Sequence, residues 1–227
     1  MSRLPFELML ALRYLRPKRT FVSVITLISI IGVTLGVAVL IIVISVMSGF
    51  DRQLREKILG FNSHIKVFQR DIPMQDFNIV RAALTNASPH VKAVAPFVMG
   101  QVMIKTQPEF GNPQISAPWM RGIDPELEGS VSSLPKNIIR GKFDVSGNGV
   151  LVGSELARLL TLDVGDRIVI YSPQALERLE KARGKDSATL PLPDEYVVRG
   201  IFDVGYFEYN ATVILTSLGN AQDLYEL

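Results

Sequence analysis

The sequence predicts a membrane-anchored α+β protein, in which one N-terminal transmembrane helix precedes a mixed-sheet domain. Three observations lead to this fold class. Residues 20–50 contain no Asp, Glu, Lys, Arg or His. Beyond residue 60, apolar and polar residues alternate in short runs that indicate strands. Short helical patterns separate these runs, and such a mixture is typical of an α+β domain.

The chain divides into three parts in sequence order. Residues 1–19 are expected to be a cytoplasmic interfacial helix, because Pro5 to Leu15 are mostly apolar and Pro17 then interrupts the pattern. Residues 20–50 are expected to be the transmembrane helix. Residues 51–227 are expected to be the α+β domain, with an inserted loop at residues 173–193.

The uncharged run is long enough to cross a bilayer. Its 31 residues would form a helix of about 45 Å, against a hydrocarbon core of about 30 Å, so we expect tilt or projection beyond the membrane. A cleaved signal peptide has a shorter apolar region and a small-residue cleavage site, which this run lacks. A buried core helix of this length is not expected in so small a chain.

The charges beside the span predict its orientation. Four cations lie within residues 13–19, whereas residues 51–57 mix both signs. Because cations favour the cytoplasmic side, we expect a cytoplasmic N-terminus and place residues 51 onward outside.

Small residues repeat along the predicted span. Gly32 and Gly36 form a GxxxG pattern, and Ser45 and Gly49 repeat the spacing. Such residues share one helix face and allow a second helix to approach closely. The alternative is that Gly and Ser are simply common in membrane helices.

The remaining sequence predicts further helices and strands. The span is expected to continue as a helix through residues 51–59 and to end at Gly60. Strands are expected at residues 64–69, within 91–105 (broken near Pro96 or Gly100), at 118–125 as a strand end and turn, and at 150–152, 167–171, 196–202 and 211–215. Helices are expected at residues 78–84, at 154–160 capped by Ser154, at 174–183, and after a cap at Thr216 or Ser217.

One connection is longer than a strand pair requires. Between the strands at 167–171 and 196–202 lies SPQALERLEKARGKDSATLPLPDE, bracketed by prolines. Hairpin connections usually have 2–5 residues. The length favours a functional loop, and disorder is the alternative.

No catalytic pattern is present in the sequence. The phosphate-binding motif GxxxxGK[ST] is missing, His64 and His90 stand alone, and there is no cysteine. A net charge of +2 is not that of a nucleic-acid binder. Any chemistry is therefore expected to come from a partner.

Several motifs together resemble a known family. These are ALRYLRPKR, the span end SVMSGFDRQLREKILG, RGIDPE, GVLVGSELARLLTLDVGDRIVIYSP and VVRGIF. They resemble the transmembrane subunits of the lipoprotein-releasing ABC transporter, the LolC/LolE type. The fourth motif also resembles the broader superfamily of macrolide-exporter and cell-division-type permeases.

The resemblance implies a place and a set of partners. It implies that the protein lies in the bacterial inner membrane, in contact with membrane lipid. It also implies that the whole subunit has four spanning helices and a periplasmic α+β core domain. The implied partners are a cytoplasmic ATPase dimer, a second permease subunit, a periplasmic lipoprotein chaperone and lipoprotein substrates. ATP and Mg would be bound by the ATPase, with no cofactor in this chain. By comparison with that family, we expect the chain to be a truncated subunit or a fragment.

The resemblance also assigns roles to particular residues. The inserted loop matches the hook that grips the chaperone, with Pro173 and Pro193 as its ends. The chaperone-binding residues implied are Pro173, Gln174, Ala175, Leu176, Leu190, Pro191, Leu192 and Pro193. Met47 matches a lipoprotein-contact position, with simple lipid contact as the alternative. Val169, Glu195 and Tyr196 stand where the family has a polar, partly basic contact pad, and they depart from that pattern.

Three functions remain open from the sequence. The first is a lipoprotein-releasing permease subunit. The second is a mechanotransmission permease that drives periplasmic partners without moving a substrate through the bilayer. The third is a scaffold that uses the span only as an anchor and tolerates loss of Gly32 and Gly36. An enzyme is the least favoured class.

Overall fold

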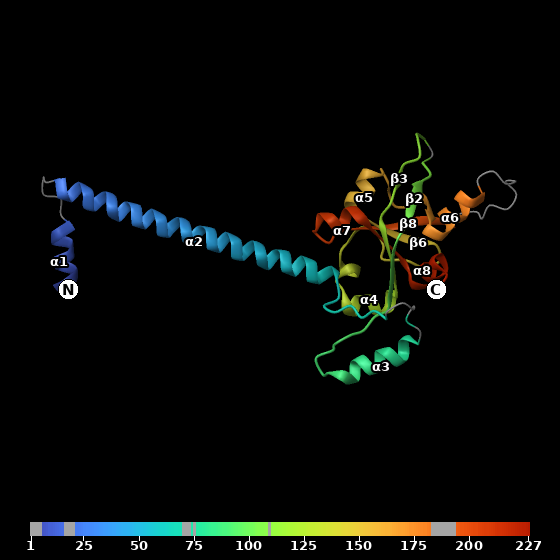
Figure 1. Cartoon of the computed structure of the whole chain (residues 1–227). Coiled ribbons are helices and arrows are strands. Elements are labelled where there is room, and N and C mark those ends of the chain that lie inside the picture. Colours follow the sequence, from blue (N-terminus) through green and yellow to red (C-terminus); the bar gives the residue numbers. More distant parts are fainter. Residues whose placement is uncertain (1–5, 16–20, 70–73, 75, 109, 183–193) are drawn as a thin grey trace. The chain divides into compact units, whose positions relative to one another are not determined.

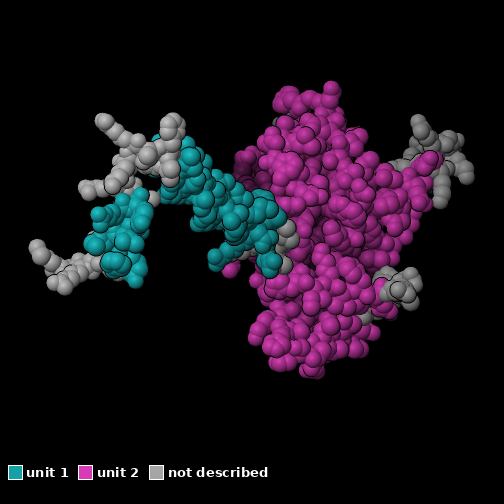
Figure 2. Space-filling model, turned by 60° about the vertical axis from the view of Figure 1, so that its left-hand side comes forward, with its two compact units in different colours: residues 1–55 teal, residues 56–227 magenta. Residues whose placement is uncertain are grey.

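A computed structural model describes residues 6–15, 21–69, 74, 76–108, 110–182 and 194–227 (Figure 1). The chain forms two compact units, residues 1–55 and residues 56–227, which Figure 2 colours separately. The helices are α1 (Phe6–Leu15), α2 (Phe21–Phe61), α3 (Phe77–Ala87), α4 (Pro125–Val131), the 3-10 turn η1 (Leu134–Lys136), α5 (Ser154–Leu159), α6 (Pro173–Ala182), α7 (Phe207–Thr212) and α8 (Leu218–Tyr225).

A mixed sheet is the framework of the second unit. Its strands are β1 (Phe97–Gln101), β2 (Met103–Thr106), β3 (Ile115–Ser116), β4 (Trp119–Ile123), β5 (Ile138–Gly141), β6 (Gly149–Gly153), β7 (Arg167–Tyr171), β8 (Asp194–Phe202) and β9 (Val213–Ser217). Their order is β1-β4-β9-β6-β8-β7-β2-β3, and β5 also pairs with β8. The pairs β4–β9 and β6–β8 are parallel, and the other pairs are antiparallel. The predicted α+β class is therefore confirmed.

Helix α2 is continuous over 41 residues. Its segment Val24–Arg55 is long and apolar enough overall to cross a membrane, and the most apolar stretch of this segment is not buried in the protein. The helix then continues through charged residues to Phe61, which confirms the predicted continuation to Gly60. One membrane-spanning helix thus precedes the sheet domain.

Successive side chains of the central strands point to opposite faces of the sheet, and each face has an apolar core. In β6, Val150 and Val152 belong to the cluster that contains Leu156 of α5 and Ala221 of α8. Leu151 points to the opposite face and joins a second cluster. Because successive side chains of a strand point to opposite faces, a continuous apolar run such as this predicts a strand covered on both sides.

The strand predicted at residues 64–69 is wrong. This segment has no strand partner in the described structure, and Ile65 and Phe68 remain largely exposed. Phe68 instead packs edge-on against Phe97, with ring centroids 5.7 Å apart. The alternation of residue types was correct for a strand, but a strand also needs a neighbour for its backbone hydrogen bonds.

Smaller corrections concern element boundaries. The break between β1 and β2 falls at Val102, whose backbone N–H donates to the carbonyl of Pro118 at 3.1 Å. The N-cap of α5 is Gly153 rather than Ser154. The last strand begins at Val213, because residues 211–212 complete α7.

Two capping residues explain helices near the ends of strands. Asp124 accepts hydrogen bonds from the backbone N–H groups of Glu126 and Leu127, so helix α4 follows the strand end predicted at residues 118–125, and this helix was not predicted. Ser217 accepts from the N–H of Asn220 and caps α8, which was one of the two predicted caps.

Candidate functional site

The inserted segment begins with a capped helix. Ser172, the last residue before α6, is buried, and its hydroxyl accepts a hydrogen bond from the N–H of Ala175 at 3.1 Å. Pro173 occupies the first helical position, where its missing N–H costs nothing. The Ser-Pro pair therefore fixes the direction in which the insert leaves β7.

The structure places the first half of the predicted hook on α6. Pro173 and Gln174 are exposed, whereas Ala175 and Leu176 are half-buried. The other four predicted residues lie outside the described residues, and they are Leu190, Pro191, Leu192 and Pro193.

An ion pair joins α6 to the C-terminal end of α8. Arg178 Nη2 lies 2.5 Å from Glu226 Oε1, and both side chains are more than half exposed. Because water screens such a pair, its contribution to the stability of the α6–α8 contact is about 1 kcal/mol or less.

The strands beside the insert do not form a basic pad. Val169 and Tyr196 are buried, with 4% and 3% of their surface exposed. Burial raises the pKa of the Tyr196 hydroxyl to about 12. Glu195 is exposed and accepts a hydrogen bond from Gln107 Nε2 at 3.2 Å, with Arg167 3.8 Å away. Of the three positions, only Glu195 is open to a partner, and it is acidic.

The predicted packing face of the membrane helix is open. A Cβ atom built on Gly32 or Gly36 would meet no other atom within 4 Å. Met47, the predicted lipoprotein-contact residue, is 65% exposed. These positions are therefore accessible for contact with a neighbouring helix or an acyl chain.

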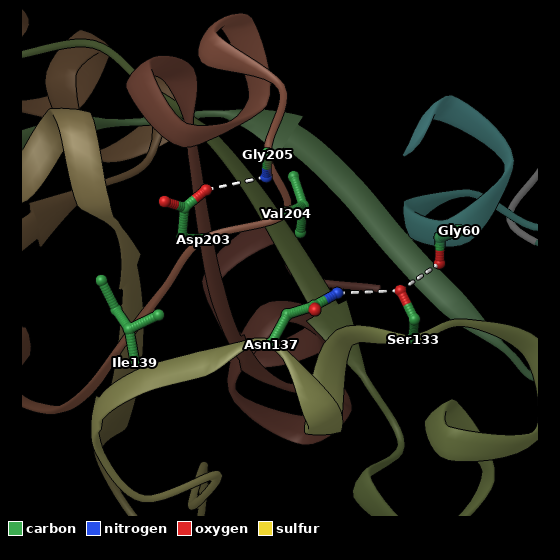
Figure 3. Close-up of a pocket in the computed structure, with 7 residues that line it drawn as sticks. All are labelled: Gly60, Ser133, Asn137, Ile139, Asp203, Val204 and Gly205. Carbon is green, nitrogen blue, oxygen red and sulfur yellow. Dashed lines mark hydrogen bonds between the residues drawn. The ribbon is translucent and has the colours of Figure 1, made fainter. Parts of the chain in front are cut away.

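A cavity of about 480 Å³ lies in the second unit beside the end of α2 (Figure 3). Its lining residues are Gly60, Ser133, Asn137, Ile139, Asp203, Val204 and Gly205. Asn137 Nδ2 donates to Ser133 Oγ at 2.9 Å, and Ser133 Oγ donates to the Gly60 carbonyl at 2.8 Å. These polar groups bond to one another, and the lining holds no pairing of nucleophile and base.

Sequence reasoning missed a buried cluster at the end of α2. The cluster consists of Phe61, Arg121, Glu128, Ser133 and Tyr209. Its most buried charges are Arg121 of β4 and Glu128 of α4, with Arg121 Nη2 3.0 Å from Glu128 Oε1. The available signal was Arg121 itself, a charged residue within an apolar strand.

The described residues offer no metal centre. Among them, no three His, Cys, Asp or Glu side chains come together to hold an ion. What the described residues present instead is an open face on α2, the exposed start of helix α6 and a hydrogen-bonded end of α2.

The fold of the described residues defines a class: a membrane-anchored protein in which one long apolar helix precedes a mixed α+β domain. The model of the MacB-like periplasmic core domain matches residues 26–226. The chain therefore belongs to the MacB-like periplasmic core domain family.

Curated relatives agree with this assignment. The chain is 32% identical over 228 residues to the lipoprotein-releasing system transmembrane protein LolC of Xylella fastidiosa, covering 98% of this chain and 52% of that protein. It is 30% identical to LolC of Neisseria meningitidis, covering 97% and 51%. LolE of Haemophilus influenzae is 29% identical over 167 residues, covering 70% and 38%.

The chain spans about half the length of the LolC proteins it matches. Its likeness to them identifies a permease domain of the LolC/LolE type, within a family that is not itself catalytic. Among solved structures, a domain of a permease protein from Porphyromonas gingivalis overlaps with a TM-score of 0.32 at 15% identity, over 56% of this chain and 49% of that one. That overlap adds nothing to the assignment.

Proposed function

We propose that this chain is the N-terminal part of a permease subunit that releases lipoproteins from the bacterial inner membrane to a periplasmic chaperone. The observation that carries the proposal is the similarity to LolC over 98% of the chain, spanning both the membrane helix and the sheet domain. Energy would come from hydrolysis of ATP, which a partner ATPase dimer would bind together with Mg. A second permease subunit would complete the membrane part.

The membrane helix supplies the features that such a subunit needs. The open face at Gly32 and Gly36 suits close packing against a partner helix. Met47 lies toward the outer end of the span and is exposed. A flexible thioether side chain adapts to acyl chains of varied shape. In this proposal the N-terminus is cytoplasmic and the sheet domain is periplasmic.

The insert supplies a surface for the chaperone. Pro173 and Gln174 stand exposed at the start of α6, and Ser172 holds that start in place. The proposal extends this surface over residues 173–193. Glu195 is the only open pad position, so the hook rather than the pad would provide most of the contact.

Photocrosslinking tests this proposal directly. A photoreactive residue is placed at Gln174, Glu177 or Leu190 in the complete subunit, assembled with its partners in cells. Matched controls at Glu126 of α4 and Phe207 of α7 are also exposed but belong to elements other than the insert.

A crosslink to the periplasmic lipoprotein chaperone is expected from the insert sites only, and ATP turnover should change its yield. If an assembled complex gives no crosslink from any insert site, the hook assignment fails. Mechanotransmission without a lipoprotein chaperone then becomes the better account. Equal crosslinking from the two control sites would show contact without specificity and would also count against the hook.

A further inference from the structure

Protein groups bind the last carbonyls of α2. The Gly60 carbonyl accepts hydrogen bonds from the backbone N–H of Ser133 at 2.7 Å and from its hydroxyl at 2.8 Å. The Phe61 carbonyl accepts a bond from Arg121 Nη1 at 3.4 Å. A helix leaves its last four carbonyls without internal partners, and these carry partial negative charge. Arg121 therefore supplies both a donor and a positive charge to this end.

Burying the charge of Arg121 costs desolvation free energy. Its residue is only 6% exposed, and burial lowers the pKa of the guanidinium, which the neighbouring Glu128 opposes. Glu128 is fully buried and also accepts a bond from the Ser132 hydroxyl at 2.6 Å. An apolar pair of similar volume is often as stable as a buried ion pair. Core stability alone thus does not explain the charges, whereas capping the helix requires a donor.

Aromatic packing fixes the same helix end. Phe61 is 3% exposed, and its ring centroid lies 4.3 Å from that of Tyr209 and 6.3 Å from that of Phe202. The guanidinium carbon of Arg121 lies 5.7 Å from the Phe61 ring centroid, within the range of a cation–π contact. Asn62 Nδ2 donates to the Tyr209 hydroxyl. The final residues of α2 are thus bound by β4, by the segment before η1 and by α7.

We propose that Arg121, Glu128 and Ser133 are positioning residues whose role is to fix the outer end of α2 to the sheet, so that a displacement of this helix end moves the sheet. This inference rests on the proposed function, because a subunit driven from the membrane side needs such transmission. A scaffold that uses its span only as an anchor does not.

Three variants of the complete subunit, reconstituted with its partner permease and ATPase, test the inference. R121M/E128L removes both buried charges and keeps apolar volume. S133A removes the hydroxyl bond to the Gly60 carbonyl and, with it, the acceptor of the Asn137 side-chain amide. R199M is the matched control, because Arg199 forms a 2.5 Å ion pair with Asp144 elsewhere in the same sheet domain.

Hydrogen exchange reports whether the helix end stays bound. The Ser133 N–H donates to Gly60, so release of the helix end exposes it. We expect its exchange in R121M/E128L to be faster by about tenfold, the factor that a charge-assisted hydrogen bond contributes. S133A should give a smaller increase at the same peptide. Exchange in β6 should not change in any variant, and R199M should leave Ser133 unchanged.

The transport assay measures whether lipoprotein release depends on the contact between the end of α2 and the sheet. We expect the lipoprotein released per ATP hydrolysed to fall roughly fivefold or more in R121M/E128L, the lower end of ordinary coupling strengths, with the ATPase rate retained. A merely structural role would leave this ratio unchanged in a folded variant.

The two readouts separate the possible failures. Unchanged exchange at Ser133 overturns the inference whatever the transport result. Faster exchange with an unchanged transport ratio overturns transmission through this contact. If the unsubstituted complex releases no lipoprotein, the proposed function fails, and exchange alone then decides whether these residues fix the helix end.

Discussion

Replacing Glu128 with leucine is expected to destabilise the sheet domain strongly, although leucine is apolar and the site is fully buried. Arg121 is 6% exposed, and among the described residues the change leaves its guanidinium with the Phe61 carbonyl, at 3.4 Å, as its one remaining hydrogen-bond acceptor. Breaking a buried ion pair in this way costs about 3–5 kcal/mol. For a domain of this size, each kcal/mol lowers the melting temperature by roughly 2–4 °C, so a loss of about 10 °C is expected.

The double variant R121M/E128L isolates the cause. Because it removes the unpaired charge, we expect it to recover most of the stability lost in E128L, to within about 1 kcal/mol of the original chain. The assay is urea unfolding in detergent micelles, followed by the fluorescence of Trp119, the only tryptophan in the chain. An E128L cost below about 1 kcal/mol, or a double variant as unstable as E128L, would refute this reasoning.

Two further predictions concern pH and helix capping. Hydrogen bonds from Ser146, and from the side chain of Arg199, lower the pKa of Asp144 to about 2, so its carboxylate stabilises the fold fully above pH 3.8 and loses this effect as the pH falls toward 2. D144N should therefore flatten the acid limb of an unfolding titration, and an unaltered limb would contradict the assignment. S217A removes the α8 cap on the Asn220 N–H and should cost about 1 kcal/mol in urea unfolding; a change near zero would show that the cap is not used.

The sequence was most informative where one local property decides the structure. A run of 31 uncharged residues specified the membrane helix, because length and charge alone decide whether a segment can cross a bilayer. Buried strands such as β6 and β7 were predicted because their apolar β-branched residues are bounded by turn signals. The insert was visible as a connection too long for a hairpin.

Long-range contacts account for what the sequence did not reveal. Residues 64–69 alternate as a strand does, yet pairing depends on neighbours that pattern cannot supply. The contact between Arg121 and the Phe61 carbonyl joins positions 60 residues apart, and Glu128 approaches from α4, a helix that the sequence did not predict. Likewise, burial of Val169 and Tyr196 follows from cover on both faces of the sheet.

The most direct test of the proposed function is lipoprotein release from proteoliposomes. The complete subunit, its partner permease and the ATPase are reconstituted with a lipoprotein, and the soluble chaperone is added outside. The proposal predicts ATP-dependent appearance of lipoprotein bound to the chaperone, reduced when residues 173–193 are replaced by a short glycine-serine link. ATP hydrolysis at a normal rate with no lipoprotein transferred to the chaperone would contradict it.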